Sequence, residues 1–158
     1  MVEGCTRDLA MFNLAIDSKL RGCDVVALRV EDVAPHGYTI DRATVRQKKT
    51  GRPVKFELTE QTRQAVDDYL AAAGKKPGEF LFTGHRAIGR PMTVRQYARL
   101  VSDWIANIGL DPRIYSTHSV RRTKVTLIYR RAGSLESTVR YVGIEVDDAL
   151  GIAEQIDV

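Results

Sequence analysis

The chain has 158 residues with a formal net charge of +4, and 44% of its residues are apolar. This length favours a single domain, and the apolar share is enough for one core and excludes wholesale disorder. No apolar run approaches the roughly 20 residues that a membrane span needs, and the charged first residues are unlike a secretion signal, so we expect a cytoplasmic protein. Two cysteines, Cys5 and Cys23, are too few for a disulfide framework or a zinc site, and we expect them to pack as small apolar groups.

The charge is distributed unevenly along the chain. Residues 145–158 contain five acidic residues and no basic one, so residues 1–144 carry a formal charge of +9. A basic body with an acidic tail indicates a polyanionic partner for the body. A solvated basic surface is the alternative, and charge alone leaves both interpretations open.

The first half of the sequence predicts two helices and a hairpin. Residues 5–20 contain apolar residues at three- and four-residue intervals, among them Leu9 and Phe12, which predicts a helix with one broad buried face. Residues 22–28 predict a second, short helix. From 30 to 59 the apolar residues are mostly two apart and Pro and Gly interrupt the run, which is typical of strands and a hairpin, with residues 49–52 at its turn.

The second half of the sequence predicts helices joined by loops. Their expected ranges are 60–73, 93–108, 117–133, 135–142 and 146–157. Thr59 is expected to cap the first of these helices and Gly74 to end it. The helix over 93–108 places Trp104 and Ile108 on its apolar face. Together these elements predict a mainly helical α+β domain with one small antiparallel sheet.

The segment THSVRRT places His118 and Arg121 three residues apart, so they share one face near the N-terminal end of the predicted helix. That end favours an anion, a histidine can give or take a proton near neutral pH, and an arginine can grip two phosphate oxygens as a fork. A surface histidine beside a salt-bridged arginine has the same spacing. The pair therefore indicates a phosphate site only in combination with other residues.

Two further basic positions add to this pattern. Arg21 lies between the first two predicted helices, where an arginine is either held toward a ligand or caps helix carbonyls. Lys49 lies at the predicted hairpin turn, where a lysine can deliver a proton or a positive charge to a backbone oxygen. Six basic residues and no acidic one fall between Arg42 and Lys55, which favours a nucleic-acid contact over a merely solvated turn.

Tyr141 lies late in the predicted helix over 135–142. A tyrosine hydroxyl is a poor nucleophile at its usual pKa near 10, but nearby arginine and lysine charges favour its ionised form. A core tyrosine is the alternative interpretation.

Taken in order, these residues resemble the catalytic domain of the tyrosine recombinase (phage integrase) family. The first arginine box of the family resembles LRGCDVVALRVEDV, and its lysine hairpin resembles QKKTGRPVKFELT. The second box resembles THSVRRTKVTLIYRR, and the nucleophile segment of small bacterial integrases resembles LESTVRYVGIEVDDAL. Four elements in family order are far more specific than any one of them.

The resemblance implies a role for each matching residue on double-stranded DNA. Arg21 and Arg121 would clamp the scissile phosphate, His118 would assist proton transfer, and Tyr141 would form a 3′-phosphotyrosyl link. Lys49 would protonate the departing 5′ oxygen, with Lys48 as the weaker candidate because the family's lysine directly precedes Thr-Gly. The family's reaction implies no metal, ATP or other cofactor.

Two features depart from the family pattern. The helical domain that usually precedes the catalytic domain has no counterpart, so we expect residues 1–158 to be a catalytic domain alone, with weak and salt-dependent DNA binding. In addition, no Gly-His box separates the second box from Tyr141. The 20 residues from Arg121 to Tyr141 are about a dozen fewer than is usual for the family.

This shortened segment limits where Tyr141 can reach. A helix from Arg121 to Gly133 climbs about 18 Å, and an antiparallel return to Tyr141 covers only about 9 Å, so the hydroxyl reaches the site marginally at best. Three arrangements stay open. Tyr141 serves a neighbouring copy's site, the chain binds DNA without cleaving it, or this sequence lacks a loop that the natural protein has.

The acidic tail is expected to make a contact between copies of the chain. The predicted helix over 146–157 has an apolar stripe and, as in the family, is expected to dock on a neighbouring copy in a homo-oligomer on DNA; docking on its own core is the alternative.

A site-specific DNA recombinase or integrase is the leading interpretation of the whole sequence. A catalytically impaired DNA-binding remnant or regulator, or a plain helical interaction domain, are the alternatives.

Overall fold

The computed structural model describes residues 2–84 and 89–132 of the chain. In this part the helices and strands, in chain order, are α1 (Val2–Ser18), α2 (Gly22–Val25), α3 (Val30–Val33), β1 (Arg42–Arg46), β2 (Pro53–Glu57), α4 (Glu60–Ala73), α5 (Val94–Asn107) and α6 (Thr117–Ala132). The strands form one two-stranded antiparallel sheet, so the predicted mainly helical α+β fold is confirmed. The predicted helices over 135–142 and 146–157 lie outside the described residues. No helix in the described ranges has the length and apolar character to cross a membrane.

Helix boundaries follow local capping chemistry. The side chain of Thr59 accepts a hydrogen bond from the backbone N–H of Thr62, and Gly74 ends α4 in the left-handed conformation, as predicted. Thr93 forms a reciprocal capping box with Gln96 at the start of α5. Helix α6 begins at Thr117, also as predicted.

The hairpin pairs β1 with β2 through residues that alternate between the core and the solvent. Ala43 and Phe56 face each other on the buried side, whereas Arg42 and Glu57 pair on the exposed side. The register leaves four residues, 48–51, as the connecting loop. Gly51 closes this loop at a φ of 67°, a left-handed conformation that glycine adopts without a steric cost.

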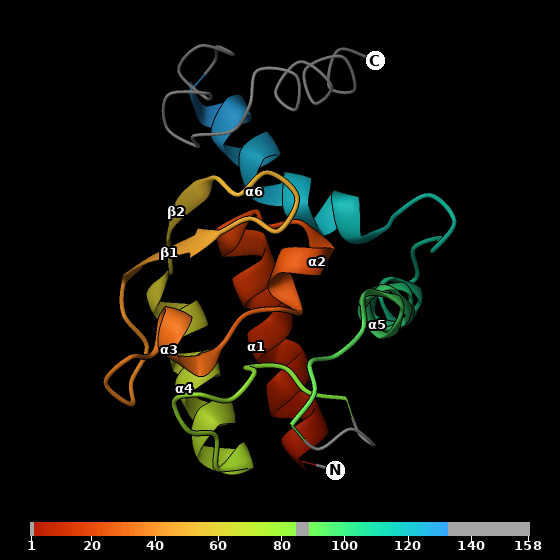
Figure 1. Ribbon diagram of the computed structural model, residues 1–158. Helices are drawn as coiled ribbons and strands as arrows, with labels where there is room; N and C mark the ends of the chain where they lie inside the picture. Colours follow the sequence, from red (N-terminus) through yellow and green to blue (C-terminus); the bar gives the residue numbers. More distant parts are fainter. Residues whose placement is uncertain (1, 85–88, 133–158) are drawn as a thin grey trace.

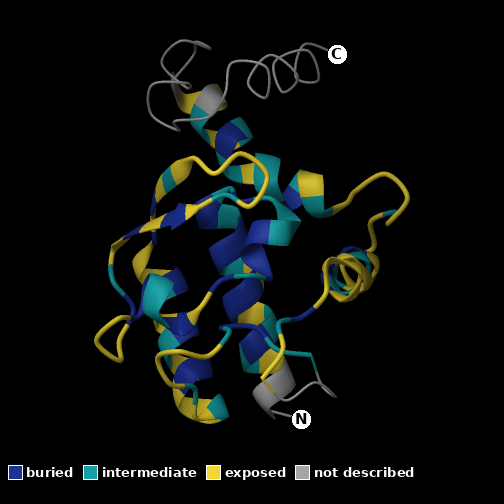
Figure 2. Cartoon of the chain, viewed as in Figure 1, coloured by how far each residue is buried: buried dark blue, intermediate teal, exposed yellow. Residues whose placement is uncertain are grey.

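Helix α1 runs through the middle of the molecule, with the hairpin and α4 on one side and α5 on the other (Figure 1). Its buried face packs chiefly against α4 and α6. The fully buried side chains come from α1, the α2–α3 segment, α4, the loop before α5, and α5 itself. Figure 2 shows buried segments along α1 and on the elements next to it. This single core leaves the hairpin loop and the first turn of α6 at the surface.

Two predictions of local structure were wrong. The helix expected over 22–28 ends at Val25, and Val30–Val33 forms a helical turn inside the segment that was expected to be a strand. The reason for the second is a cap, because the backbone N–H of Arg29 donates to the carboxylate of Asp32 at 2.8 Å. This turn directs the chain back toward β1.

Three burial predictions were also wrong. Leu9 and Phe12 of α1 remain 53% and 39% exposed, and Ile108 at the end of α5 remains 72% exposed. The buried face of α1 contains Ala10, Met11, Leu14 and Ala15. Cys5 is exposed and Cys23 is only half-buried, so neither thiol packs as a core residue.

Candidate active site

Arg21 is held at the beginning of α2 by a residue of the hairpin. Its guanidinium Nη1 donates to the side-chain Oε1 of Gln47 at 3.1 Å. The same Oε1 accepts the hydroxyl of Thr50 at 2.7 Å, so one amide oxygen joins Arg21 to the hairpin loop. The expectation that Arg21 is held in place is thus met by a residue 26 positions away.

The hairpin loop has a second anchor on α2. Asp24 is buried, and its Oδ1 accepts the backbone N–H of Lys48 at 2.8 Å. Next to it, Gly22 lets the ring of Tyr97 lie under α2, since a Cβ at Gly22 would be 3.3 Å from the ring. These contacts fix the backbone that carries Lys48 and Lys49 relative to Arg21.

Arg121 reaches the same region from α6. Its Nε donates to the backbone carbonyl oxygen of Lys19 at 2.8 Å. Lys19 has a φ of 57°, the one positive φ of a non-glycine residue in the described part of the chain. Because Lys19 precedes Arg21 by two residues, this contact brings both predicted phosphate-binding arginines to one short segment.

An ion pair to a buried carboxylate supports this contact one helical turn farther along α6. The Nζ of Lys124 lies 2.8 Å from Oδ1 of Asp17, whose side chain is 6% exposed. The other oxygen of Asp17 accepts the backbone N–H and the hydroxyl of Thr59 at 2.8 and 2.9 Å. Burial alone raises the pKa of Asp17, but hydrogen bonds from Lys124, Thr62 and Thr59 outweigh it and lower this pKa below its usual value.

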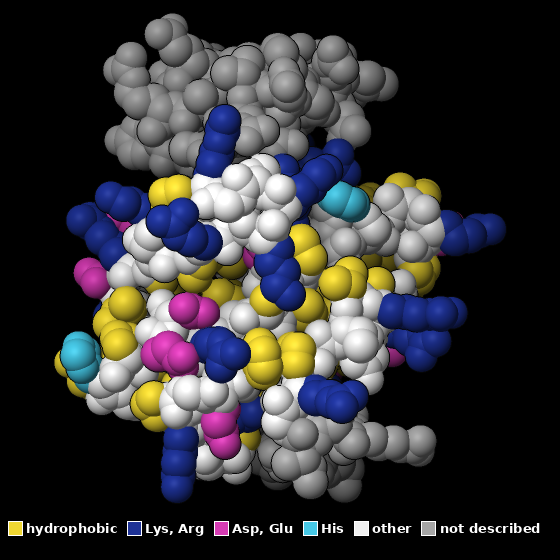
Figure 3. All heavy atoms as spheres, in the orientation of Figure 1, with side chains coloured by type: hydrophobic (Ala, Val, Ile, Leu, Met, Phe, Trp, Pro, Cys, Tyr) yellow, Lys and Arg dark blue, Asp and Glu magenta, His cyan; other side chains and the backbone are white. Residues whose placement is uncertain are grey.

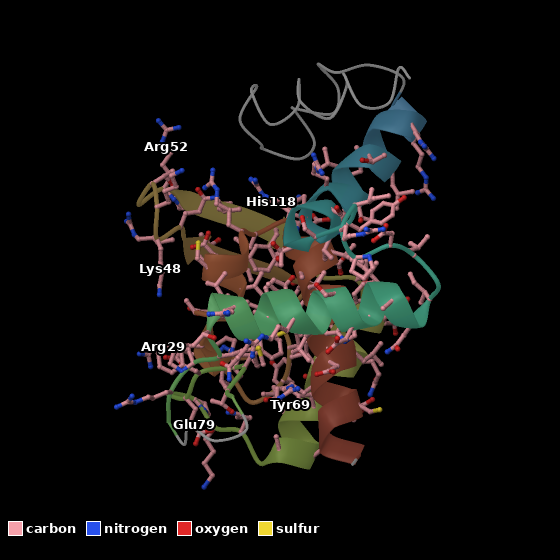
Figure 4. All side chains as sticks on the ribbon, turned by 90° about the vertical axis from the view of Figure 1, so that its right-hand side faces the viewer. Arg29, Lys48, Arg52, Tyr69, Glu79 and His118 are labelled. Carbon is pink, nitrogen blue, oxygen red and sulfur yellow. The ribbon has the colours of Figure 1, made fainter. Side chains whose placement is uncertain are left out.

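The other two described candidates lie at the surface. His118 projects from the first turn of α6, and Lys48 and Arg52 project from the end of the hairpin (Figure 4). Lys49 and His118 are both exposed. On the face seen in Figure 3, basic side chains gather over the hairpin and the nearby part of α6. The arrangement offers an accessible basic surface beside two held arginines, which suits a phosphodiester backbone.

Tyr141 and residues 133–140 before it lie outside the described residues. Burial raises the pKa of Tyr97, the tyrosine under α2. Within residues 2–84 and 89–132, no group of three His, Cys, Asp or Glu side chains lies close enough to hold a metal ion.

An apolar groove lies between α1, α5 and α6. Its volume is about 330 Å³, and its lining residues are Asp8, Leu9, Phe12, Val101, Trp104, Ile105, Ile108 and Val120. The rings of Phe12 and Trp104 meet edge to face with centroids 5.6 Å apart. The wrongly predicted burial of Leu9, Phe12 and Ile108 is explained by this groove, which nothing in the described residues fills.

A family model described as the phage integrase family matches residues 3–143. The chain belongs to this family. The family-level resemblance of the four sequence segments is therefore confirmed, whereas the roles of individual residues stay predictions.

Curated relatives and solved structures agree with this membership. The probable integrase/recombinase YoeC of Bacillus subtilis (strain 168) is 28% identical over 153 residues, which cover 89% of this chain and 80% of that protein. Tyrosine recombinase XerC of Caldanaerobacter subterraneus subsp. tengcongensis is 28% identical over 127 residues, which cover 78% of this chain but only 34% of that protein.

Among solved structures, XerA recombinase matches with a TM-score of 0.74 and 19% identity, over 93% of this chain and 51% of that chain. XerH site-specific recombinase bound to difH substrate in a pre-cleavage complex matches with a TM-score of 0.74 and 15% identity, over 97% of this chain and 44% of that chain. These likenesses establish the fold. The chain spans about half the length of these solved recombinases.

Sequence reasoning missed the residues that hold the candidate site together. Gln47, Asp24 and Lys19 each contact a predicted site residue or its loop, yet none stood out in the sequence. One available signal was the spacing of Asp24 three residues after Arg21, which places both at the first turn of α2. The sequence contains no signal for the carbonyl of Lys19, because every residue has a backbone carbonyl. Only the fold shows which carbonyl accepts the hydrogen bond from Arg121.

Proposed function

We propose that this chain is the catalytic domain of a site-specific DNA recombinase or integrase that acts on double-stranded DNA in the cytoplasm. The observation that carries the proposal is the convergence on residues 19–21 of Arg121 from α6 and, through Gln47, of the hairpin loop. Two guanidinium groups beside an accessible basic surface suit a charged phosphodiester better than a neutral ligand. Membership of the phage integrase family supports the same conclusion.

The proposed reaction exchanges one phosphoester bond for another. The hydroxyl oxygen of Tyr141 bonds to the scissile phosphorus as the bond to the 5′ oxygen breaks, which leaves a 3′-phosphotyrosyl link. His118 assists removal of the tyrosine proton, and Lys49 gives a proton to the departing 5′ oxygen. Arg21 and Arg121 neutralise the charge that builds on the nonbridging oxygens. The link conserves the bond energy, so a new 5′-hydroxyl reseals the strand without ATP or a metal ion.

The experiment that tests this function is covalent trapping on nicked DNA. The full chain is incubated with a pool of nicked duplexes of randomised sequence, in which a short cleaved strand diffuses away and prevents resealing. We expect a protein–DNA adduct that resists denaturation and is lost in Tyr141→Phe. Loss of the adduct in Arg21→Ala and Arg121→Ala supports the assigned roles, whereas adducts at wild-type levels in both contradict them.

The same assay separates the arrangements of Tyr141. When Tyr141→Phe and Arg121→Ala are mixed, an adduct forms only if the tyrosine of one copy attacks in the site of another. Adducts from the wild type but not from the mixture indicate attack within one copy. DNA retention without any adduct from the wild type favours the second candidate function, a DNA-binding remnant, for which the 20-residue spacing from Arg121 to Tyr141 is the supporting observation.

The homo-oligomer is part of the proposal. We propose that residues 146–157 of one copy dock into the apolar groove of another, because the groove is lined by apolar side chains and the segment has an apolar stripe. Phe12→Asp is expected to weaken self-association in sedimentation equilibrium with DNA present, whereas Tyr38→Ser, at a residue 60% exposed outside the groove, leaves it unchanged. Equal self-association of Phe12→Asp and the wild type would indicate that the segment packs elsewhere.

A further inference from the structure

The last turn of α1 is an unusual place for a buried acid. Asp17 is 5% exposed, and its two oxygens accept three hydrogen bonds, from Lys124 and from the N–H and hydroxyl of Thr59. The segment that follows is constrained as well, because Lys19 holds a left-handed conformation that is unfavourable for a residue with a Cβ. A buried acid and a backbone outlier within three residues point to a requirement other than simple packing.

Asp17 and Lys19 both form contacts with α6. Lys124 contacts the carboxylate of Asp17, and Arg121 contacts the carbonyl of Lys19, each at 2.8 Å. Residues three apart on a helix lie on neighbouring positions of one face, about 4.5 Å apart along its axis. Two such contacts fix both the rotation of α6 and its position along its own axis. The buried side chains of Val120 and Val125 also hold α6 against the core, so the two polar contacts act in addition to this packing.

The left-handed turn at Lys19 explains why the carbonyl is available. The N–H of Lys19 donates back to the carbonyl of Ala15 at 3.3 Å and so closes α1, while the chain reverses toward Arg21. Its carbonyl oxygen receives Arg121 in place of a helical partner. Burial, and then the charge of Lys124, lower the pKa of the Lys19 side chain. The cationic groups packed here are thus Lys19, Lys124 and Arg121, and Asp17 faces them from α1.

We propose that Asp17 and Lys124 are positioning residues whose ion pair, together with the carbonyl of Lys19, sets the rotation of α6 and so places Arg121 beside Arg21. The pair touches no DNA in this proposal; it acts through Arg121 and through His118, one turn earlier on the same face. This inference rests on the proposed function for its catalytic consequence. Its structural part concerns the free protein alone.

The test uses variants that separate position from charge. Lys124→Met keeps the aliphatic length and removes the ion pair, Lys124→Arg keeps the pair, and Arg130→Met removes a charge from an exposed site on the same helix. The first readout needs no DNA: exchange of the Arg121 Nε–H with solvent, measured by ¹⁵N NMR. We expect exchange about 10-fold faster in Lys124→Met and wild-type exchange in the other two variants.

The second readout is the single-turnover rate of adduct formation on the nicked duplex pool. At saturating DNA we expect a rate about 10- to 100-fold lower in Lys124→Met, with rescue by Lys124→Arg and no change in DNA affinity beyond that of Arg130→Met. A lost affinity with an unchanged rate would assign Lys124 to DNA binding and overturn the proposal. A general loss of stability does not produce this split between rate and affinity in the folded fraction.

The two proposals fail in different ways. If the wild type forms no adduct, the proposed function fails, but the exchange of the Arg121 Nε–H still decides the positioning role. If that exchange is unchanged in Lys124→Met, the positioning role is wrong whether or not DNA is cleaved. Asp17→Asn keeps an oxygen for Thr59 and removes the charge, so it provides the same comparison where Lys124→Met fails to fold.

Discussion

Helix α1 exposes apolar side chains in one part and buries polar side chains in another. Near its N-terminus, Leu9 and Phe12 are 53% and 39% exposed along the apolar groove. At its C-terminus, Asp17 and Ser18 are 5% and 0% exposed. The acid is buried where hydrogen-bond partners from the start of α4 and from α6 converge on it, and apolar residues stay exposed where no described element covers them.

The difference shows what each end contributes. The C-terminal end is a structural junction for α1, α4 and α6, and the predicted phosphate-binding arginines lie next to it. The N-terminal half offers a surface whose exposed apolar area favours association with another segment. One helix therefore serves the candidate active site at one end and the proposed copy-to-copy contact at the other.

The largest difference in the free energy of unfolding is expected between truncations of two leucines of α1. Leu14 is completely buried, so Leu14→Ala is expected to lower the free energy of unfolding by about 3–4 kcal/mol through lost contacts and a cavity. Leu9→Ala is expected to lower it by less than about 1 kcal/mol, because the side chain already contacts solvent. Urea denaturation measures both, and equal losses would show that the groove is filled in solution.

The second test concerns the buried acid. Asp17→Ala is expected to lower the free energy of unfolding by about 3 kcal/mol, because it leaves Lys124 and the N–H of Thr59 without their acceptor. The matched control is Glu57→Ala, which breaks the exposed pair with Arg42 and is expected to cost less than about 1 kcal/mol. Similar values for both variants in urea denaturation would place Asp17 in an essentially solvated environment.

The contribution of Asp17 to stability is expected to depend on pH. The folded state lowers the pKa of Asp17 below its ordinary value of 3.8. The carboxylate therefore stabilises the fold above that value, and this contribution is lost as the pH falls through the lower, folded-state pKa. The stability difference between the wild type and Asp17→Asn should shrink below pH 3.8, by at most about 1.4 kcal/mol per pH unit. A difference that is constant down to pH 2 would rule out a titrating Asp17.

The smallest effect is expected at Lys19. Glycine adopts the left-handed conformation freely, and this gain exceeds the entropy that glycine adds to the unfolded chain. Lys19→Gly is thus expected to raise the free energy of unfolding by about 0.5–1 kcal/mol, whereas Lys19→Val lowers it because a β-branched residue resists a positive φ. Thermal unfolding of the two variants provides the measurement. A loss of stability in Lys19→Gly would mean that the lysine side chain outweighs the backbone.

Local chemistry was predictable from the sequence. Thr59 and Thr93 cap helices through their own side chains, and Gly74 and Gly51 adopt left-handed conformations where a chain must turn. Each of these signals depends on residues within a few positions of one another. The same locality explains why the hairpin loop was predicted within one residue of its place.

The connections between elements were not predictable in the same way. Arg121 and Lys19 are 102 residues apart, and only the packing of α6 on α1 brings them together. The apolar spacing in α1 indicated one broad buried face, but it contains no information on which part of that face another element covers. The order of the four family segments predicted that the arginines converge, whereas the acceptors that hold them, Gln47 for Arg21 and the carbonyl of Lys19 for Arg121, emerged only from the fold.

The amide oxygen of Gln47 has two lone pairs, and Arg21 and Thr50 occupy both. One amide oxygen therefore links Arg21 to the hairpin loop. In the proposed function, a DNA phosphate that draws Arg21 away from Gln47 would leave this oxygen to the Thr50 hydroxyl alone, so binding at the arginine would also change a contact of the loop.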